Sequence, residues 1–109
     1  MQEPVVVKEL TLKEKIYATA EKWNVSGDQM YKTIECESGF NEKALNASDP
    51  YGGAHGVAQF LKPTFYSYAK EMGLKDADIN NTDQQLDVMG YMFSKKQQRQ
   101  WSCWRMIYQ

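Results

Sequence analysis

The 109-residue sequence lacks the features that mark several large functional classes. Its longest apolar run, "PVVV" at residues 4–7, is too short for a transmembrane helix or a signal-peptide core. The 14 acidic and 13 basic residues are well mixed, so no basic stripe is available to follow a nucleic-acid backbone. A single histidine, His55, leaves a zinc site with too few ligands. We therefore expect no nucleic-acid partner, no membrane span, no metal and no other cofactor.

Cysteine is also scarce, and composition alone leaves the state of Cys36 and Cys103 open. They are either two buried thiols of a cytosolic protein or one disulfide of an exported protein. The polar opening "MQEP" resembles the start of a trimmed chain, so the missing leader says little about the compartment.

Aromatic residues are the enriched class, with seven Tyr, four Phe and three Trp. In a chain of this length most of them fill one modest core, and the others often line sites for flat or sugar-like ligands. We expect a loose segment over residues 1–10 and a single domain over residues 11–109, acting as a monomer.

Local signals predict four helices separated by one long loop. Thr11 with Glu14 and Ser26 with Gln29 have capping-box spacing, and the second pair opens a helix over residues 27–38. The following segment, residues 39–61, is rich in Gly, Asn, Asp and Ser. It predicts a long structured loop with at most a short strand near 55–60.

Two further helices follow this loop. Pro63 suits the first turn of a helix that ends at Gly73, and Asn81 or Thr82 caps the next one. The aromatic tail from Gln100 carries no clear element. The predicted class is therefore mainly α.

Within the helix over residues 27–38, the two glutamates beside Cys36 fall on different faces. At 3.6 residues per turn, Glu37 shares the apolar face of Met30 and Ile34, whereas Glu35 points away from it. A carboxyl group on that face, near the negative end of the helix dipole, has a raised pKa, as a general acid for glycosidic cleavage requires. The alternative is that Glu37 is structural and caps a loop or pairs with a lysine, Lys43 or Lys62.

Four short segments resemble known families. "ESGFN" at residues 37–41 and "HGVAQFLKPT" at 55–64 resemble the soluble lytic transglycosylases, whose pattern is Glu-Ser, an aromatic, Gly-Leu-Met-Gln and Pro-x-Thr. "CES" at 36–38 and "WSCW" at 101–104 instead resemble the resuscitation-promoting factors, in which a Cys before the catalytic Glu pairs with a Cys in a Trp-rich segment. Both families share the lysozyme-like α fold, and the resemblance spans about residues 13–105.

The resemblance implies roles for individual residues. Glu37 would be the catalytic acid/base, with Ser38 beside it. Gly56 would let backbone and sugar approach closely, and Gln59 would place an amide in the cleft. Tyr91 would face the cleft from the fourth helix, with a core tyrosine as the equally weighted alternative.

The sequence departs from the transglycosylase pattern at two places, and the resemblance also implies a disulfide. Val57-Ala58 stands where Leu-Met is usual, which suggests a roomier saccharide subsite. The Ala-Tyr-Asn motif is missing, so the hydrogen-bond partner of the catalytic Glu is not identified. The resemblance also implies a Cys36–Cys103 disulfide that clamps the tail against the back of the catalytic helix, and hence an extracytoplasmic protein of bacterial or phage type.

The implied substrate is the glycan strand of peptidoglycan, cut between N-acetylmuramic acid and N-acetylglucosamine. A lytic transglycosylase needs a single Glu, whereas a hydrolytic lysozyme needs a second carboxylate, for which Asp49 and then Glu42 are the candidates. A silent glycan-binding module would need only sugar stacking on Tyr51, Phe60 or Trp101. A structural or inhibitory lysozyme-like protein is the remaining alternative. The core-facing Glu37 argues against the last two alternatives, because a binder gains nothing by burying an unpaired acid. Because no clear second carboxylate stands beside it, we favour the single-Glu transglycosylase over the hydrolase.

Overall fold

The computed structural model describes residues 9–47 and 52–109, and helices dominate both ranges. The elements in chain order are α1 (Leu12–Trp23), α2 (Gly27–Ser38), β1 (Leu45–Asn46), β2 (Ala54–His55), β3 (Phe60–Leu61), α3 (Lys62–Glu71), α4 (Thr82–Ser94), the 3-10 turn η1 (Gln98–Gln100) and α5 (Ser102–Tyr108). The predicted mainly α class is confirmed. None of the described helices combines the length and the apolar character that crossing a membrane requires.

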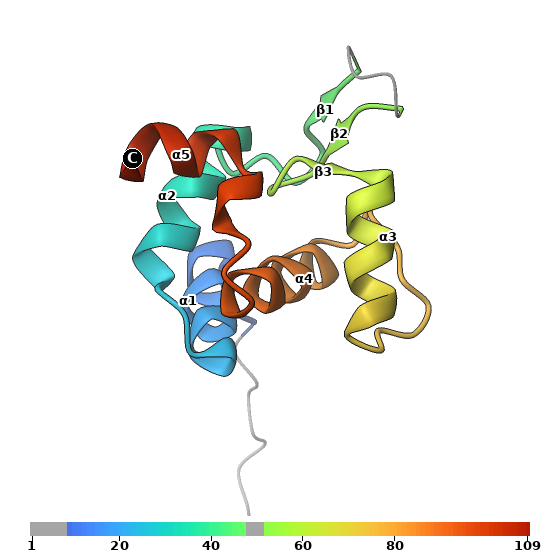
Figure 1. Ribbon diagram of the computed structural model, residues 1–109, viewed down its shortest axis with the longest axis horizontal. Coiled ribbons are helices and arrows are strands. Elements are labelled where there is room, and N and C mark those ends of the chain that lie inside the picture. The colour runs from blue at the N-terminus through green and yellow to red at the C-terminus, as the bar shows by residue number, and fades with distance from the viewer. Residues whose placement is uncertain (1–8, 48–51) are drawn as a thin grey trace, which may run out of the picture.

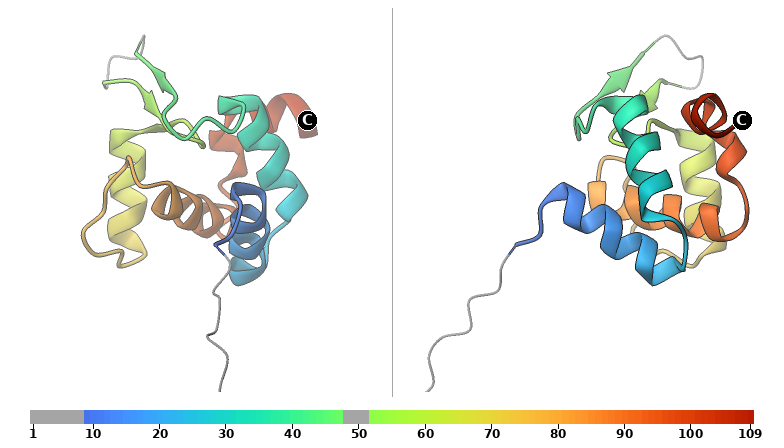
Figure 2. Two further views of the ribbon diagram at one scale, coloured as in Figure 1. Left: turned by 180° about the vertical axis from the view of Figure 1, so that it is seen from behind. Right: turned by 90° about the vertical axis from the view of Figure 1, so that its left-hand side faces the viewer.

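Helix α4 lies at the centre of the arrangement (Figure 1). Helices α1 and α3 both contact it, α2 packs on α1, and α5 lies against α2. The small sheet lies above α3 in Figure 1, and both views of Figure 2 show the C-terminal helix α5 beside α2. The central position explains the unusually apolar character of α4, whose buried residues are Gln85, Leu86, Val88, Met89, Gly90, Met92 and Phe93.

Side-chain caps start the first two helices. The predicted box at α1 is complete: the Thr11 hydroxyl accepts from the Glu14 N–H at 3.2 Å, and the Glu14 carboxylate accepts from the Thr11 N–H at 2.9 Å. At α2 only half of the predicted box forms. Ser26 accepts from the Gln29 N–H at 3.2 Å, but the Gln29 side chain accepts from the indole N–H of Trp104 at 2.9 Å. The missing half is replaced by a contact that fastens α5 to α2.

The later helices begin where local signals predict. Pro63 lies in the first turn of α3, and Gly73 follows its end with a φ of 76°. Asn81 caps α4 by accepting from the Gln84 N–H at 3.1 Å. The two proposed caps at residues 81 and 82 are thus resolved in favour of Asn81.

The long loop predicted over residues 39–61 contains more strand than expected. Three two-residue strands form an antiparallel sheet in the order β1-β2-β3, with Asn46 opposite Ala54 and Ala54 opposite Leu61. Strands of this length have no readable alternation, so the loop composition dominated the prediction. A four-residue turn, residues 56–59, joins β2 to β3.

The aromatic tail, for which no element was predicted, forms η1 and α5. Trp101 is 5% exposed, and its indole N–H donates to the Ala58 carbonyl at 2.9 Å. Helix α5 has no side-chain cap. Its position therefore depends on tertiary contacts with the rest of the domain.

Candidate active site

The last turn of α2 places Glu37 at the boundary between core and surface. Met30 and Ile34, on the same face, are fully buried, while Glu37 is half-buried and Glu35 is exposed. The helical spacing alone accounts for this difference between the two glutamates.

Glu37 lies in a cleft of about 290 Å³ between α2, the sheet and the start of α5. The lining residues come from eight different elements and the segments between them: Glu37, Asn46, Ala54, Gln59, Phe60, Leu61, Thr64, Met92, Gln100, Trp101 and Ser102. Among these described residues, Glu37 supplies the only carboxylate. The cleft therefore has one candidate acid, surrounded by apolar and amide-bearing side chains.

The Glu37 carboxylate accepts a hydrogen bond from the backbone N–H of Cys103 at 3.3 Å. Burial raises the pKa of Glu37 above its ordinary value, while the Cys103 N–H and the positive charge of Arg105 act in the opposite direction. The net rise keeps more of the carboxyl group protonated, which suits a general acid. The Cys103 N–H is the partner that the missing Ala-Tyr-Asn motif left unidentified. No ion pair within residues 9–47 and 52–109 joins Glu37 to Lys43 or Lys62.

A disulfide joins Cys36 to Cys103, with an S–S distance of 2.04 Å and a Cα–Cα distance of 5.9 Å. The bond predicted from the resemblance is confirmed. It connects the residue before Glu37 to the residue whose N–H bonds the Glu37 carboxylate. Helices α2 and α5 are thus joined by one covalent bond and one hydrogen bond at the same place.

Gln59 and Phe60 both line the cleft. Gln59 has a φ of 52°, and its side-chain NH₂ donates to the carbonyls of Gly56, at 2.9 Å, and Ala44, at 3.3 Å. This amide therefore fixes the turn as well as facing the cleft. Phe60 is 3% exposed and packs edge-on against Trp101, with ring centroids 5.5 Å apart.

Three of the predicted site residues lie outside the lining of this cleft. Ser38 donates its hydroxyl to the Ile34 carbonyl at 3.2 Å, within its own helix. Tyr91 stacks edge-on against Trp23 and donates to the Glu71 carboxylate at 3.1 Å, so it connects helices instead of facing the cleft. Gly56 is the third.

Gly56 is buried with a φ of 74°, and a Cβ there would clash with the side-chain amide of Gln85. This contact inside the fold requires a glycine at position 56. Val57 and Ala58 are likewise fully buried and do not line the cleft, so they do not enlarge a saccharide subsite.

Sequence reasoning missed Gln85 and the Cys103 N–H. Gln85 falls four and eight residues before the core residues Met89 and Phe93, so a polar residue on the apolar face of the fourth helix was the available signal. The N–H of Cys103 has no sequence signal, because it belongs to the backbone.

Other polar groups do not form a comparable site. Within the described ranges no three His, Cys, Asp or Glu side chains gather as metal ligands, and the Nε2 of His55 lies 3.2 Å from the Gly52 carbonyl. Glu42 lines a different hollow with Leu45 and His55, on the opposite face of the hairpin from Asn46. Asp49 and Tyr51 lie outside the described residues.

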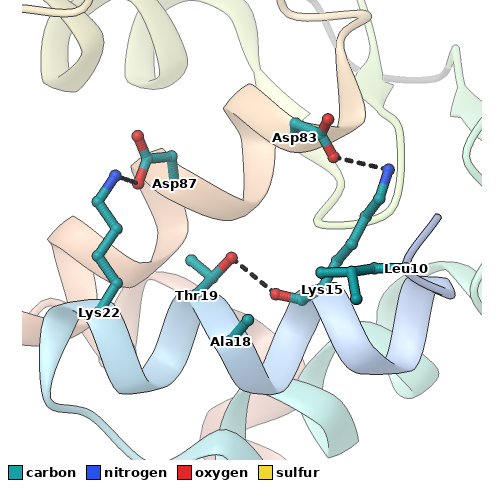
Figure 3. Close-up of a pocket in the computed structure, with 7 residues that line it drawn as sticks. All are labelled: Leu10, Lys15, Ala18, Thr19, Lys22, Asp83 and Asp87. Carbon is teal, nitrogen blue, oxygen red and sulfur yellow. Dashed lines mark hydrogen bonds and ion pairs between the residues drawn. The ribbon is translucent and has the colours of Figure 1, made fainter. Parts of the chain in front are cut away.

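A hollow of about 400 Å³ also lies between α1 and α4 (Figure 3). Its charged side chains are paired across it, Lys15 with Asp83 at 3.0 Å and Lys22 with Asp87 at 2.8 Å. Thr19 donates to the Lys15 carbonyl at 2.7 Å. The two ion pairs fasten α1 to α4, and none of the predicted site residues lines this hollow.

The family comparison is consistent with this geometry. A family model, Transglycosylase SLT domain, matches residues 14–108, from the first turn of α1 to the end of α5. The chain belongs to this family and has its mainly α, lysozyme-like fold. Membership implies a peptidoglycan-cleaving lytic transglycosylase activity, directed at a substrate outside the cytoplasm. Comparisons with curated proteins and with solved structures give no match.

Proposed function

We propose that this protein is a lytic transglycosylase that cleaves peptidoglycan between N-acetylmuramic acid and N-acetylglucosamine, with Glu37 as its single acid/base. The observation that carries the proposal is the setting of Glu37. Its carboxyl group is half-buried, lies in a cleft and has a pKa raised by burial. A protein that only binds glycan has no use for a protonated carboxyl group there.

In the proposed reaction Glu37 first donates its proton to the glycosidic oxygen, and the bond from that oxygen to the muramic acid breaks. The positive charge that develops on the muramic acid ring is then quenched by the primary hydroxyl of the same sugar. The proton of this hydroxyl passes to the Glu37 carboxylate, which restores the acid. The product is an anhydro-muramic acid end, and no water is consumed.

Among the described residues that line the cleft a single carboxylate is present, which favours this route over hydrolysis. An inverting lysozyme holds a second carboxylate on the other side of the scissile bond to activate water. Of the two candidates, Glu42 lies on the opposite face of the hairpin and Asp49 lies outside the described residues. Asp49→Asn separates the two reactions, because a hydrolase with Asp49 as base would lose activity and a single-Glu transglycosylase would keep it.

We further propose that Gln59, Phe60 and Trp101 contact the glycan from the cleft wall, and that Ser38 supports Glu37 through its helix. The domain, residues 11–109, would act as a monomer outside the cytoplasm. The disulfide supports this location, because such bonds persist in oxidising compartments.

Glu37→Gln tests the proposal with little change in shape. An amide cannot donate the proton, so release of glycan fragments from purified peptidoglycan should fall by on the order of a hundred- to ten-thousand-fold. Glu35→Gln, two residues away on the exposed side of α2, is the matched control and should retain activity. A dead Glu35→Gln variant, or an active Glu37→Gln variant, contradicts the assignment.

A further inference from the structure

Gln85 is a fully buried amide in the centre of the fold, and it is not part of the cleft lining. The other buried polar side chain among the described residues is Thr33. An amide in an apolar interior is costly unless its hydrogen-bonding groups are satisfied. A position that needed only to fill space would take a leucine or a methionine, as its neighbours on α4 do.

The amide of Gln85 bonds three backbone groups from two separate segments. Its oxygen accepts from the Ala58 N–H at 3.1 Å, and its NH₂ donates to the carbonyls of His55, at 2.9 Å, and Ile79, at 2.6 Å. Both N–H groups are therefore used. Two of the three partners belong to the hairpin turn between β2 and β3 or to the residue before it.

This turn has little regular structure to hold it in place. Two of its four residues, Gly56 and Gln59, have positive φ values of 74° and 52°. Ala58, between them, is held on both sides: its N–H by Gln85, and its carbonyl by the indole of Trp101. The absence of a Cβ on Gly56 leaves room for the Gln85 amide.

The residues that follow Ala58 are Gln59 and Phe60, which form part of the cleft wall facing Glu37. A displacement of Ala58 therefore moves this wall relative to the acid. Glu37 itself is held separately, by the N–H of Cys103 on α5.

We propose that Gln85 is a positioning residue for glycan binding, whose buried amide holds the turn 56–59 so that Gln59 and Phe60 face Glu37. The inference rests on the proposed function. A glutamine at this place sets the shape of the cleft through the backbone, without touching the substrate.

The experiment measures binding of a soluble tetrasaccharide of alternating N-acetylglucosamine and N-acetylmuramic acid by titration calorimetry, in a Glu37→Gln background that cannot cleave it. Gln85→Met keeps the volume but removes all three hydrogen bonds. Its dissociation constant should rise about tenfold, which is roughly what the loss of one well-placed hydrogen bond to the glycan costs. Met89→Leu, on the same face of α4 and also fully buried, is the matched control and should bind as the parent does.

Two readouts separate positioning from simple loss of stability. Hydrogen exchange of the Ala58 N–H should accelerate in Gln85→Met relative to the amides of α1, at a temperature where circular dichroism shows the variant folded. With Glu37 restored, the KM of Gln85→Met for glycan strands should exceed that of the parent. The pH dependence of turnover should be the same in the two proteins. That combination is expected because Gln85 makes no hydrogen bond to Glu37 or to Cys103, the residue whose N–H bonds the Glu37 carboxylate.

Each remaining outcome decides the question. Faster exchange at Ala58 with unchanged binding overturns the positioning role. If the parent chain binds no glycan, the proposed function fails and this inference fails with it. If Gln85→Met does not fold, Gln85→Glu replaces it, keeping an oxygen for the Ala58 N–H but losing both donors. In the Glu37→Gln background, the Gln85→Glu variant should bind the tetrasaccharide more weakly than the protein with Gln85 intact. Equal binding by the two proteins overturns the inference.

Discussion

Removal of the disulfide should change both the melting temperature of this domain and the pH dependence of its activity. Cys36 and Cys103 are 67 positions apart, and closing a loop of that length in the unfolded chain stabilises the fold by roughly 4 kcal/mol. Total stability of a single domain is about 5–15 kcal/mol, so this is a large share. The double variant Cys36→Ser/Cys103→Ser should therefore melt roughly 17 °C lower than the parent, measured by calorimetry.

The same variant should also change the pH dependence of activity. The bond holds α5 against α2, and α5 supplies the N–H that Glu37 accepts. That hydrogen bond lowers the pKa of Glu37, so its loss raises the pKa further. A general acid is active while protonated, and activity is lost as pH rises through its pKa. The alkaline limb of the profile should therefore move to higher pH, while the maximal rate falls because Glu37 is held less firmly.

The assay is clearance of purified peptidoglycan across pH, at a temperature well below the melting point of the variant. Met106→Ala, on the exposed side of α5, is the control and should match the parent in both measurements. A disulfide-free variant with parental melting temperature and parental pH profile would refute the reasoning. Two alkylated thiols in the native, unreduced protein would refute the bond itself.

Two other substitutions in or near the cleft have separable effects. Gln59→Ala removes a cleft amide and its two bonds to the turn, so turnover should fall and denaturant titration should show a loss of about 1 kcal/mol; parental kinetics on glycan strands would remove Gln59 from the site. Arg105→Gln removes a positive charge that lowers the pKa of Glu37, so the alkaline limb should move to higher pH. That shift should shrink as salt is added, because an exposed charge is screened, and a shift to lower pH would contradict the electrostatic account.

The parts of the fold that were predictable from the sequence are those set by neighbouring residues. The box at Thr11, the bounds of α2 and the cap at Asn81 all depend on residues within one turn of each other. The wheel assignment that separates Glu37 from Glu35 depends only on the helical period.

The parts that were missed depend on contacts between distant segments. The two-residue strands exist through pairing between positions such as Asn46 and Ala54, and α5 is a seven-residue helix without a side-chain cap. An isolated helix of that length is unstable in water. Its helical state is therefore stabilised by tertiary contacts such as the disulfide and the hydrogen bond from the Trp104 indole N–H to the Gln29 side chain.

The part of the site that was predictable from the sequence is the residue whose own side chain supplies the proposed chemistry. The residue type and helical spacing of Glu37 identify it as a candidate from the sequence alone. The position of Tyr91 between Trp23 and Glu71, in contrast, follows from tertiary packing. The hydrogen bond by which Gln85 holds the turn 56–59 likewise forms only once Ala58 is folded against α4.

Mass spectrometry of the fragments released from purified peptidoglycan is the most direct test of the central claim, that Glu37 alone performs a non-hydrolytic cleavage. The parent chain and Asp49→Asn should both release fragments that end in anhydro-muramic acid, and Glu37→Gln should release essentially none. Reducing muramic acid ends in place of anhydro ends would contradict the single-Glu mechanism. No fragments from the parent chain would contradict the catalytic role itself.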